Sequence, residues 1–139
     1  MSDSSNNACP FCALPAGRVI DSNDLALVIE DAFPVSHGHT LVVSRRHVES
    51  FFDLTPDELA AVADLLRRAK ARLDERDRPD GYNVGVNVGR DAGQTVMHVH
   101  VHLIPRYGGD VPAPRGGVRN VIPGKGDYTP PTRGDSRDG

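Results

Sequence analysis

The chain carries several short runs in which β-prone apolar residues dominate or alternate with polar ones, and these runs predict strands. The first two runs are separated by the polar residues SND, which is typical of a hairpin. The last two runs are joined by a glycine-containing loop. The five predicted strands are residues 17–21 (GRVID), 25–31 (LALVIED), 39–44 (HTLVVS), 82–89 (YNVGVNVG) and 98–104 (HVHVHLI).

One segment has a helical period instead. Thr55 can cap its first turn, Pro56 suits that turn, and Glu58 completes a capping box three residues after the cap. Apolar side chains then recur at helical spacing until the turn sequence RDRPDG. The predicted apolar stripe consists of Leu59, Val62, Leu66, Ala69 and Leu73. A helix that covers one face of a mainly antiparallel sheet gives an α+β domain.

Both ends of the chain differ from this central part. Residues 1–8 and 124–139 are rich in Ser, Asn, Gly, Pro and charged residues, so we expect flexible termini around one domain at residues 9–123. An ordered part of roughly 100 residues buries a modest core, which favours a homodimer that extends the sheet.

Composition and charge exclude several classes of protein. Of the 139 residues, 38% are hydrophobic and 25% are charged, as in soluble globular proteins. The formal net charge of −3 argues against a general nucleic-acid binder. No apolar run approaches the roughly 20 residues of a membrane span. The first ten residues do not resemble a secretory signal, so we expect a cytoplasmic protein with no membrane partner.

Three histidines occupy every second position of the stretch MHVHVHLIPR. On a strand, His98, His100 and His102 share one face at intervals of about 7 Å, and the apolar residues between them share the other face. The simplest interpretation is the polar face of a half-buried strand, although Thr, Lys, Glu or Ser would serve equally well there. Two chemical interpretations are three imidazole ligands of a catalytic metal, and a neutral imidazole that attacks phosphorus.

Neutral hydrogen-bonding groups near this strand favour the phosphorus chemistry. Gln94 and Thr95 precede the histidines, and Asn87 lies on the preceding predicted strand. Such side chains suit phosphate oxygens. A catalytic metal usually requires carboxylates nearby, and Asp91 and Asp110 are the two that the sequence offers.

The two cysteines of the chain, Cys9 and Cys12, form the motif CPFC. In a cytoplasmic protein, such a pair indicates a metal or redox element rather than a structural disulfide. Tetrahedral zinc would need two further ligands. Reduced thiols packed as small hydrophobic side chains are the alternative.

The segment GYNVGVNVGRDAGQTVMHVHVHLIPR resembles the signature region of the histidine triad (HIT) superfamily, whose motif is His-φ-His-φ-His-φ-φ with φ apolar. Residues 98–104 meet every position of that motif. The resemblance extends to ED at 30–31, GHTLVVSRRH at 38–47 and GGDVPAPRGGVRNVIP at 108–123. It implies a HIT-like fold with a five-stranded, mainly antiparallel sheet and a covering helix, which dimerises so that two sheets join.

The resemblance implies unequal roles for the residues around the triad. His100 would be the nucleophile that forms a nucleotidyl-histidine intermediate. His102 would contact the phosphate, and Asn87, Gln94 and Thr95 would contact phosphate oxygens or the leaving group. The related hexose-1-phosphate uridylyltransferases end the motif in glutamine, so the third histidine favours hydrolysis over transfer to a sugar phosphate.

Two more residues match nucleotide-binding positions of the family. Asp31 matches the residue that holds ribose hydroxyls, and His39 matches an additional histidine near the site. Each has a simpler alternative, which is a strand-end carboxylate for Asp31 and a core histidine bonded to the backbone for His39.

The resemblance also completes the ligand set around the cysteines. Many bacterial HIT proteins combine such a pair with two histidines, which match His47 and His98 here. This implies a closed, structural Cys2His2 zinc site formed by Cys9, Cys12, His47 and His98. No organic cofactor is implied.

The resulting hypothesis is a nucleotide hydrolase. It would cleave a phosphoanhydride or phosphoramidate bond at the α-phosphate of an adenosine or other purine nucleotide, such as a diadenosine polyphosphate or adenosine 5′-phosphoramidate. Two alternatives stay open. One is a nucleotide- or partner-binding module with negligible catalysis, and the other is a metallohydrolase whose metal is bound by the three triad histidines.

Overall fold

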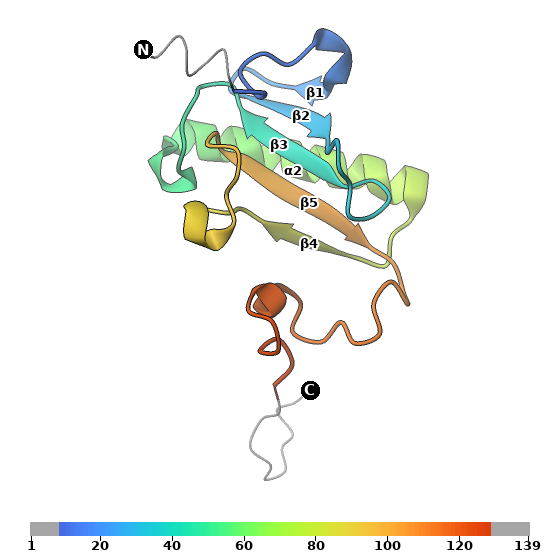
Figure 1. Ribbon diagram of the computed structural model, residues 1–139. Coiled ribbons are helices and arrows are strands. Elements are labelled where there is room, and N and C mark those ends of the chain that lie inside the picture. The colour runs from blue at the N-terminus through green and yellow to red at the C-terminus, as the bar shows by residue number, and fades with distance from the viewer. Residues whose placement is uncertain (1–8, 129–139) are drawn as a thin grey trace. The chain divides into compact units, whose positions relative to one another are not determined.

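A five-stranded antiparallel sheet and one long helix are the main elements of the computed structural model, which describes residues 9–128 (Figure 1). The strands lie in the order β1-β2-β3-β5-β4. These elements are β1 (Val19–Ser22), β2 (Ala26–Glu30), β3 (Thr40–Ser44), α2 (Pro56–Asp77), β4 (Gly81–Gly85) and β5 (His100–Arg106). Short 3₁₀ helices are η1 (Ala16–Arg18), η2 (Phe51–Asp53), η3 (Arg90–Ala92) and η4 (Gly117–Val121). The predicted α+β fold is confirmed.

The pairing of β3 with β5 fixes which side chains share a face of the sheet. Val43 lies opposite His100, and Leu41 lies opposite His102. On the other side of β5, Gly85 of β4 is the partner of His102. Opposed residues of antiparallel strands point to the same face. The two histidines therefore project from the middle of the sheet between short or apolar neighbours.

The predicted bounds of two strands differ from the observed ones. The run 82–89 ends as a strand at Gly85, and Gly89 has a φ of 94°, which an extended strand does not permit. His98 lies before β5, as does Val99, which bonds to Val48 in the loop after β3 and to Ser44 at the end of β3. The N–H of Val99 donates to the carbonyl of Val48, and its carbonyl accepts from the N–H of Ser44.

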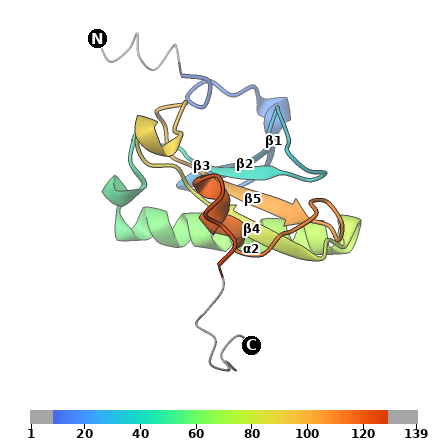
Figure 2. The ribbon, with the colours of Figure 1, turned by 60° about the horizontal axis from the view of Figure 1, so that its bottom comes forward.

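Helix α2 covers one face of the sheet, and the N-terminal segment lies on the other face (Figure 2). The buried apolar side chains of the helix are Val62, Leu65, Ala69 and Leu73, which pack on Val28, Val42, Val99, Val101 and Leu103 of the sheet and the segment before β5. The predicted stripe was wrong at Leu59, which is 38% exposed, and it omitted Leu65, which is fully buried. Glu58 is buried at the first turn in place of Leu59.

The predicted capping box is confirmed and extends to the sheet. The hydroxyl of Thr55 accepts from the N–H of Glu58, and the Glu58 carboxylate accepts from the N–H of Thr55. Arg46, which follows β3, donates to both oxygens of that carboxylate at 2.9 and 2.8 Å. The bonds from Arg46 and then from Thr55 lower the pKa of Glu58 to about 2. The start of the helix is thus anchored by an ionised, buried carboxylate.

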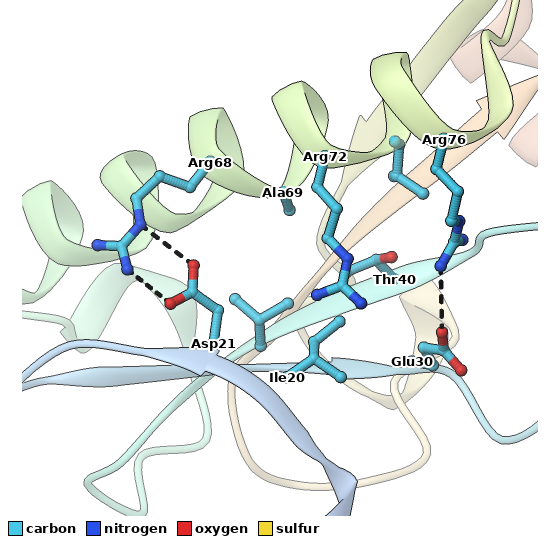
Figure 3. Close-up of a pocket in the computed structure, with 10 residues that line it drawn as sticks. Ile20, Asp21, Glu30, Thr40, Arg68, Ala69, Arg72 and Arg76 are labelled. Atoms are coloured by element: carbon cyan, nitrogen blue, oxygen red, sulfur yellow. Dashed lines mark hydrogen bonds and ion pairs between the residues drawn. The ribbon is translucent and has the colours of Figure 1, made fainter.

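Ion pairs connect the second half of the helix to β1 and β2 (Figure 3). Arg68 donates to the carboxylate of Asp21 on β1 at 2.6 Å, and Arg76 lies 3.8 Å from the carboxylate of Glu30 on β2. Arg72 lies between these pairs, and Ala69 gives the sheet room to approach. Partly exposed pairs of this kind contribute little free energy.

Residues from Gly108 onward form a second unit, which the structure describes as far as Tyr128. Within it, the guanidinium of Arg119 donates to the carbonyls of Lys125 and Gly126 and lies over the ring of Tyr128. The expected flexible residues 1–8 lie outside the described residues, as does most of the expected tail at 124–139. The predicted division of the chain near residue 123 stays a prediction.

Two further expectations concern partners. Within residues 9–128, no helix combines the length and the apolarity that crossing a membrane requires. The homodimer stays a prediction, and β1 and β4, the two edge strands, are where another sheet could pair.

Candidate active site and metal centre

The face of the sheet opposite α2 carries the histidines and a small apolar cluster. Ile29, Leu41 and Val43 are buried there, side by side on β2 and β3, and Phe11 from the CPFC motif packs against them. Because the pairing places Leu41 and Val43 opposite the two histidines of β5, imidazoles and apolar side chains adjoin on one surface. The apolar residues of these strands are nearly fully buried, so the histidines adjoin a packed cluster that supports this face of the sheet.

His100 has one ring nitrogen fixed by the backbone. Its Nδ1 lies 2.7 Å from the carbonyl oxygen of His98. A carbonyl can only accept, so Nδ1 carries the proton and, in the neutral ring, Nε2 carries the lone pair. The ring is 8% exposed and contacts the edge of the Phe11 ring at a centroid distance of 5.0 Å. In the neutral form of His100, the lone pair is thus on Nε2.

His102, His39 and Asp31 form a second group on this face. The Nε2 atom of His39 lies 3.0 Å from Nδ1 of His102 and 3.4 Å from a carboxylate oxygen of Asp31. Burial lowers the pKa of both histidines, although Asp31 acts in the opposite direction on each. Both rings are therefore neutral at pH 7. The structure brings together three residues that the sequence places on three different segments.

The loop before β5 uses its glutamine differently from what the sequence suggested. Gln94 is buried, and its amide oxygen accepts from the N–H of Gly89 at 2.8 Å. Its amide nitrogen donates to the carbonyls of Glu49 and Val96. These three bonds to the backbone hold the loop in shape. Thr95, the next residue, is exposed.

The two cysteines, His47 and His98 converge with metal-ligand geometry. The sulfur of Cys9 lies 3.3 Å from Nδ1 of His98, and the sulfur of Cys12 lies 3.1 Å from Nδ1 of His47. All four ligand atoms lie within 4.8 Å of one another. In tetrahedral zinc coordination, sulfur and nitrogen ligands are about 3.6 Å apart, so a small contraction or expansion suffices. These residues are placed to bind a metal.

The tautomer of His98 also fits a metal ligand. Its Nε2 lies 2.7 Å from the carbonyl oxygen of Ser44 and must donate to it, which leaves the lone pair of Nδ1 directed at the cysteines. A metal-bound histidine usually donates its other nitrogen to such an acceptor. His98 is fully buried, and Cys9 is 7% exposed. The protonation and burial of His98 therefore agree with its expected role as a ligand of the Cys2His2 site.

The three triad histidines do not form a metal site of their own. Within residues 9–128, two groups have three or more donors close enough for one ion, namely the Cys2His2 set and the group of Asp31, His39 and His102. The ring of His98 is directed to the cysteines, away from such an arrangement. The geometry gives no support to the metallohydrolase alternative.

Comparison with known proteins identifies the family. The HIT domain model matches residues 15–109. The chain belongs to the HIT family. A 16.1 kDa HIT-like protein of Mycoplasma pneumoniae is 39% identical over 106 residues, which are 73% of this chain and 74% of that protein. The AP-4-A phosphorylase of Mycobacterium tuberculosis is 35% identical over 77% of this chain and 58% of the phosphorylase.

A solved HIT structure resembles this chain in fold. It is a zinc-bound histidine triad family protein from Mycobacterium smegmatis, with a TM-score of 0.68 and 35% identity over 76% of this chain and 79% of that one. The HIT fold inferred from the sequence is confirmed. The family membership supports a nucleotide-processing activity in general terms.

Three contributors to the site were missed by reasoning from the sequence. Phe11 stands between the two cysteines, and its ring contacts both His98 and His100. The carbonyls of His98 and Ser44 orient the histidine rings. An aromatic residue inside CPFC was a visible signal, but backbone carbonyls leave no signal in a sequence.

The role of Gln94 as a loop support can be tested by substitution. Gln94→Ala removes three hydrogen bonds and leaves loop backbone groups without partners, so the free energy of unfolding should fall by about 2 kcal/mol. Thr95→Ala, at the exposed neighbour, should change it by less than about 0.5 kcal/mol. Urea denaturation measures both. Equal stability of the two variants would show that Gln94 does not support the loop.

Proposed function

We propose that this HIT protein is a nucleotide hydrolase that cleaves a phosphoanhydride or phosphoramidate bond at the α-phosphate of an adenosine or other purine nucleotide. The observation that carries the proposal is the hydrogen bond from Nδ1 of His100 to the His98 carbonyl, which leaves Nε2 as a nucleophile. Diadenosine polyphosphates and adenosine 5′-phosphoramidate are the candidate substrates. The 35% identical AP-4-A phosphorylase supports this substrate class.

The reaction would proceed in two displacements at phosphorus. In the first, Nε2 of His100 attacks the α-phosphate, a phosphorus–nitrogen bond forms, and the bond to the leaving group breaks as that group takes up a proton. In the second, water attacks the same phosphorus, loses a proton, and releases the nucleoside monophosphate while the phosphorus–nitrogen bond breaks. Two displacements through a labile phosphorus–nitrogen bond replace one difficult step.

The remaining predicted residues would bind the nucleotide around this centre. Asp31 would accept hydrogen bonds from the ribose hydroxyls, and His102 would donate to a phosphate oxygen. Thr95 and Asn87 are the donors proposed for the phosphate or the leaving group, and Gln94 would act on them by holding the loop.

Substitution of the nucleophile tests the mechanism. His100→Ala should lower kcat at least about 10³-fold, because no other group replaces the lost nucleophile, while nucleotide binding stays measurable. His37→Ala is the matched control, because His37 is an exposed histidine outside the triad. The effect is measured as turnover of a panel of dinucleoside polyphosphates and adenylates by three proteins, namely the wild type and the two variants. Full activity of the His100 variant would exclude the mechanism.

The same panel separates the alternatives. A binding module would show nucleotide affinity without turnover in any of the three proteins. The relationship to a phosphorylase also raises phosphate as an acceptor in place of water. Reactions run with and without inorganic phosphate distinguish these outcomes, because water yields AMP from the adenylylated enzyme and phosphate yields ADP.

We further propose that the metal held by the Cys2His2 set is zinc and that it is structural. Zinc accepts two thiolates and two imidazoles in a closed tetrahedral site, and the zinc-bound relative from M. smegmatis supports this choice. Bound there, it would tie the N-terminal CPFC motif to His47 and His98, and so hold Phe11 on the sheet.

Removal of the thiols tests the zinc site. The double variant Cys9→Ser, Cys12→Ser should lose stoichiometric zinc and unfold at a lower temperature, because the free energy of zinc binding stabilises the folded chain. Elemental analysis and thermal unfolding measure the two effects. His37→Ala should keep both the zinc content and the unfolding temperature. Wild-type protein that purifies without zinc and keeps its stability in a chelator would contradict the site.

A further inference from the structure

His39 is nearly enclosed behind His102. Its side chain is 3% exposed, so its ring is not available to a ligand on the face of the sheet opposite α2. The N–H of Val35 donates to Nδ1 of His39 at 3.1 Å. A backbone N–H can only donate, so Nδ1 of His39 carries no proton. The neutral ring must therefore carry its proton on Nε2.

The proton on Nε2 of His39 is directed at two acceptors. One is Nδ1 of His102 at 3.0 Å, and the other is a carboxylate oxygen of Asp31 at 3.4 Å. The shorter contact joins two ring nitrogens, and only one of them can hold the shared proton. Because His39 supplies it, Nδ1 of His102 must accept. The neutral ring of His102 then carries its own proton on Nε2.

The same bond from Val35 argues against a metal at this group. A metal bound to Nε2 of His39 would need the lone pair of that nitrogen, and the neutral ring would then carry its proton on Nδ1. An Nδ1–H would face the N–H of Val35, donor against donor. The three donors of Asp31, His39 and His102 are thus close together for a reason other than metal binding.

The position of His102 gives its tautomer a consequence. Its ring is only partly buried, and its centroid lies 5.3 Å from that of His100 on the face opposite α2. A proton fixed on Nε2 makes His102 a neutral hydrogen-bond donor beside the nucleophile. Donors held in advance near a reacting phosphate stabilise the charge that develops on its oxygens.

We propose that His39 is a positioning residue that fixes the proton of His102 on Nε2, so that His102 meets the α-phosphate as a neutral hydrogen-bond donor. The inference rests on the proposed function for its catalytic part. It moves His39 from direct nucleotide contact, as the family resemblance implied, to a role exerted through His102. It also assigns the chain Val35, His39, His102 a single direction of hydrogen bonding.

The direct test is ¹⁵N NMR of the full-length, metal-loaded protein labelled in its histidines. The two nitrogens of a neutral imidazole differ in chemical shift according to which one carries the proton. We expect His102 to be protonated on Nε2 and unprotonated on Nδ1, with a scalar coupling across the hydrogen bond from His39. Comparison with a His102→Gln spectrum assigns the signals. Protonation of Nδ1 of His102 in the wild-type protein overturns the inference.

Two substitutions separate positioning from packing. His39→Leu fills the site without a donor, so His102 should populate both tautomers and kcat should fall roughly 10-fold. His39→Gln keeps an N–H near the position of Nε2, so it should restore the Nε2–H tautomer and most of the lost rate. A His39→Leu protein with an unchanged His102 tautomer overturns the inference. If the leucine variant does not fold, the wild-type and glutamine spectra still decide.

The spectra also separate this inference from the proposed function. They require no substrate, so an Nε2–H tautomer in a protein that turns over no nucleotide would refute the proposed function alone. Turnover through His100 with the opposite tautomer of His102 would refute the positioning role alone.

Discussion

The antiparallel pairing of β3 with β5 is the constraint on which the rest of the site depends. Side chains alternate along β5, and this pairing places Val101 and Leu103 in the core against α2. His100 and His102 then lie on the opposite face of the sheet. A shift of one residue in this register would bury the histidines in the core and expose the apolar residues. The burial that stabilises the fold therefore also fixes the face on which the chemistry occurs.

Four histidines on that face are distinguished by the partner of one ring nitrogen. His98 and His100 each donate to a backbone carbonyl, which leaves the lone pair of the neutral ring on the other nitrogen, suited to a metal in His98 and, in the proposed mechanism, to phosphorus in His100. His39 accepts from a backbone N–H, so its other nitrogen is a donor, and His102 accepts from it in turn. The backbone thus assigns the tautomers of His39, His98 and His100 directly, and that of His102 through His39.

The sequence predicted the elements and the site to different extents. The strands, the capping box at Thr55 and the grouping of two cysteines with two histidines followed from spacing and family resemblance, because these depend on local pattern or on motif residues. The burial of Glu58 in place of Leu59 was not predicted, since it depends on the contact of Glu58 with Arg46, which follows β3. The roles of Phe11 and of the carbonyls depend on long-range packing, which no local pattern records.

The central claim is that Nε2 of His100 becomes covalently bound to the nucleotide. The most direct measurement is rapid-quench mass spectrometry of the wild-type protein mixed with a diadenosine polyphosphate, under alkaline conditions that preserve a phosphorus–nitrogen bond. The account predicts a transient mass increase of one adenylyl group, located on His100 by peptide fragmentation. Turnover without any adduct, or an adduct located on another residue, would contradict it.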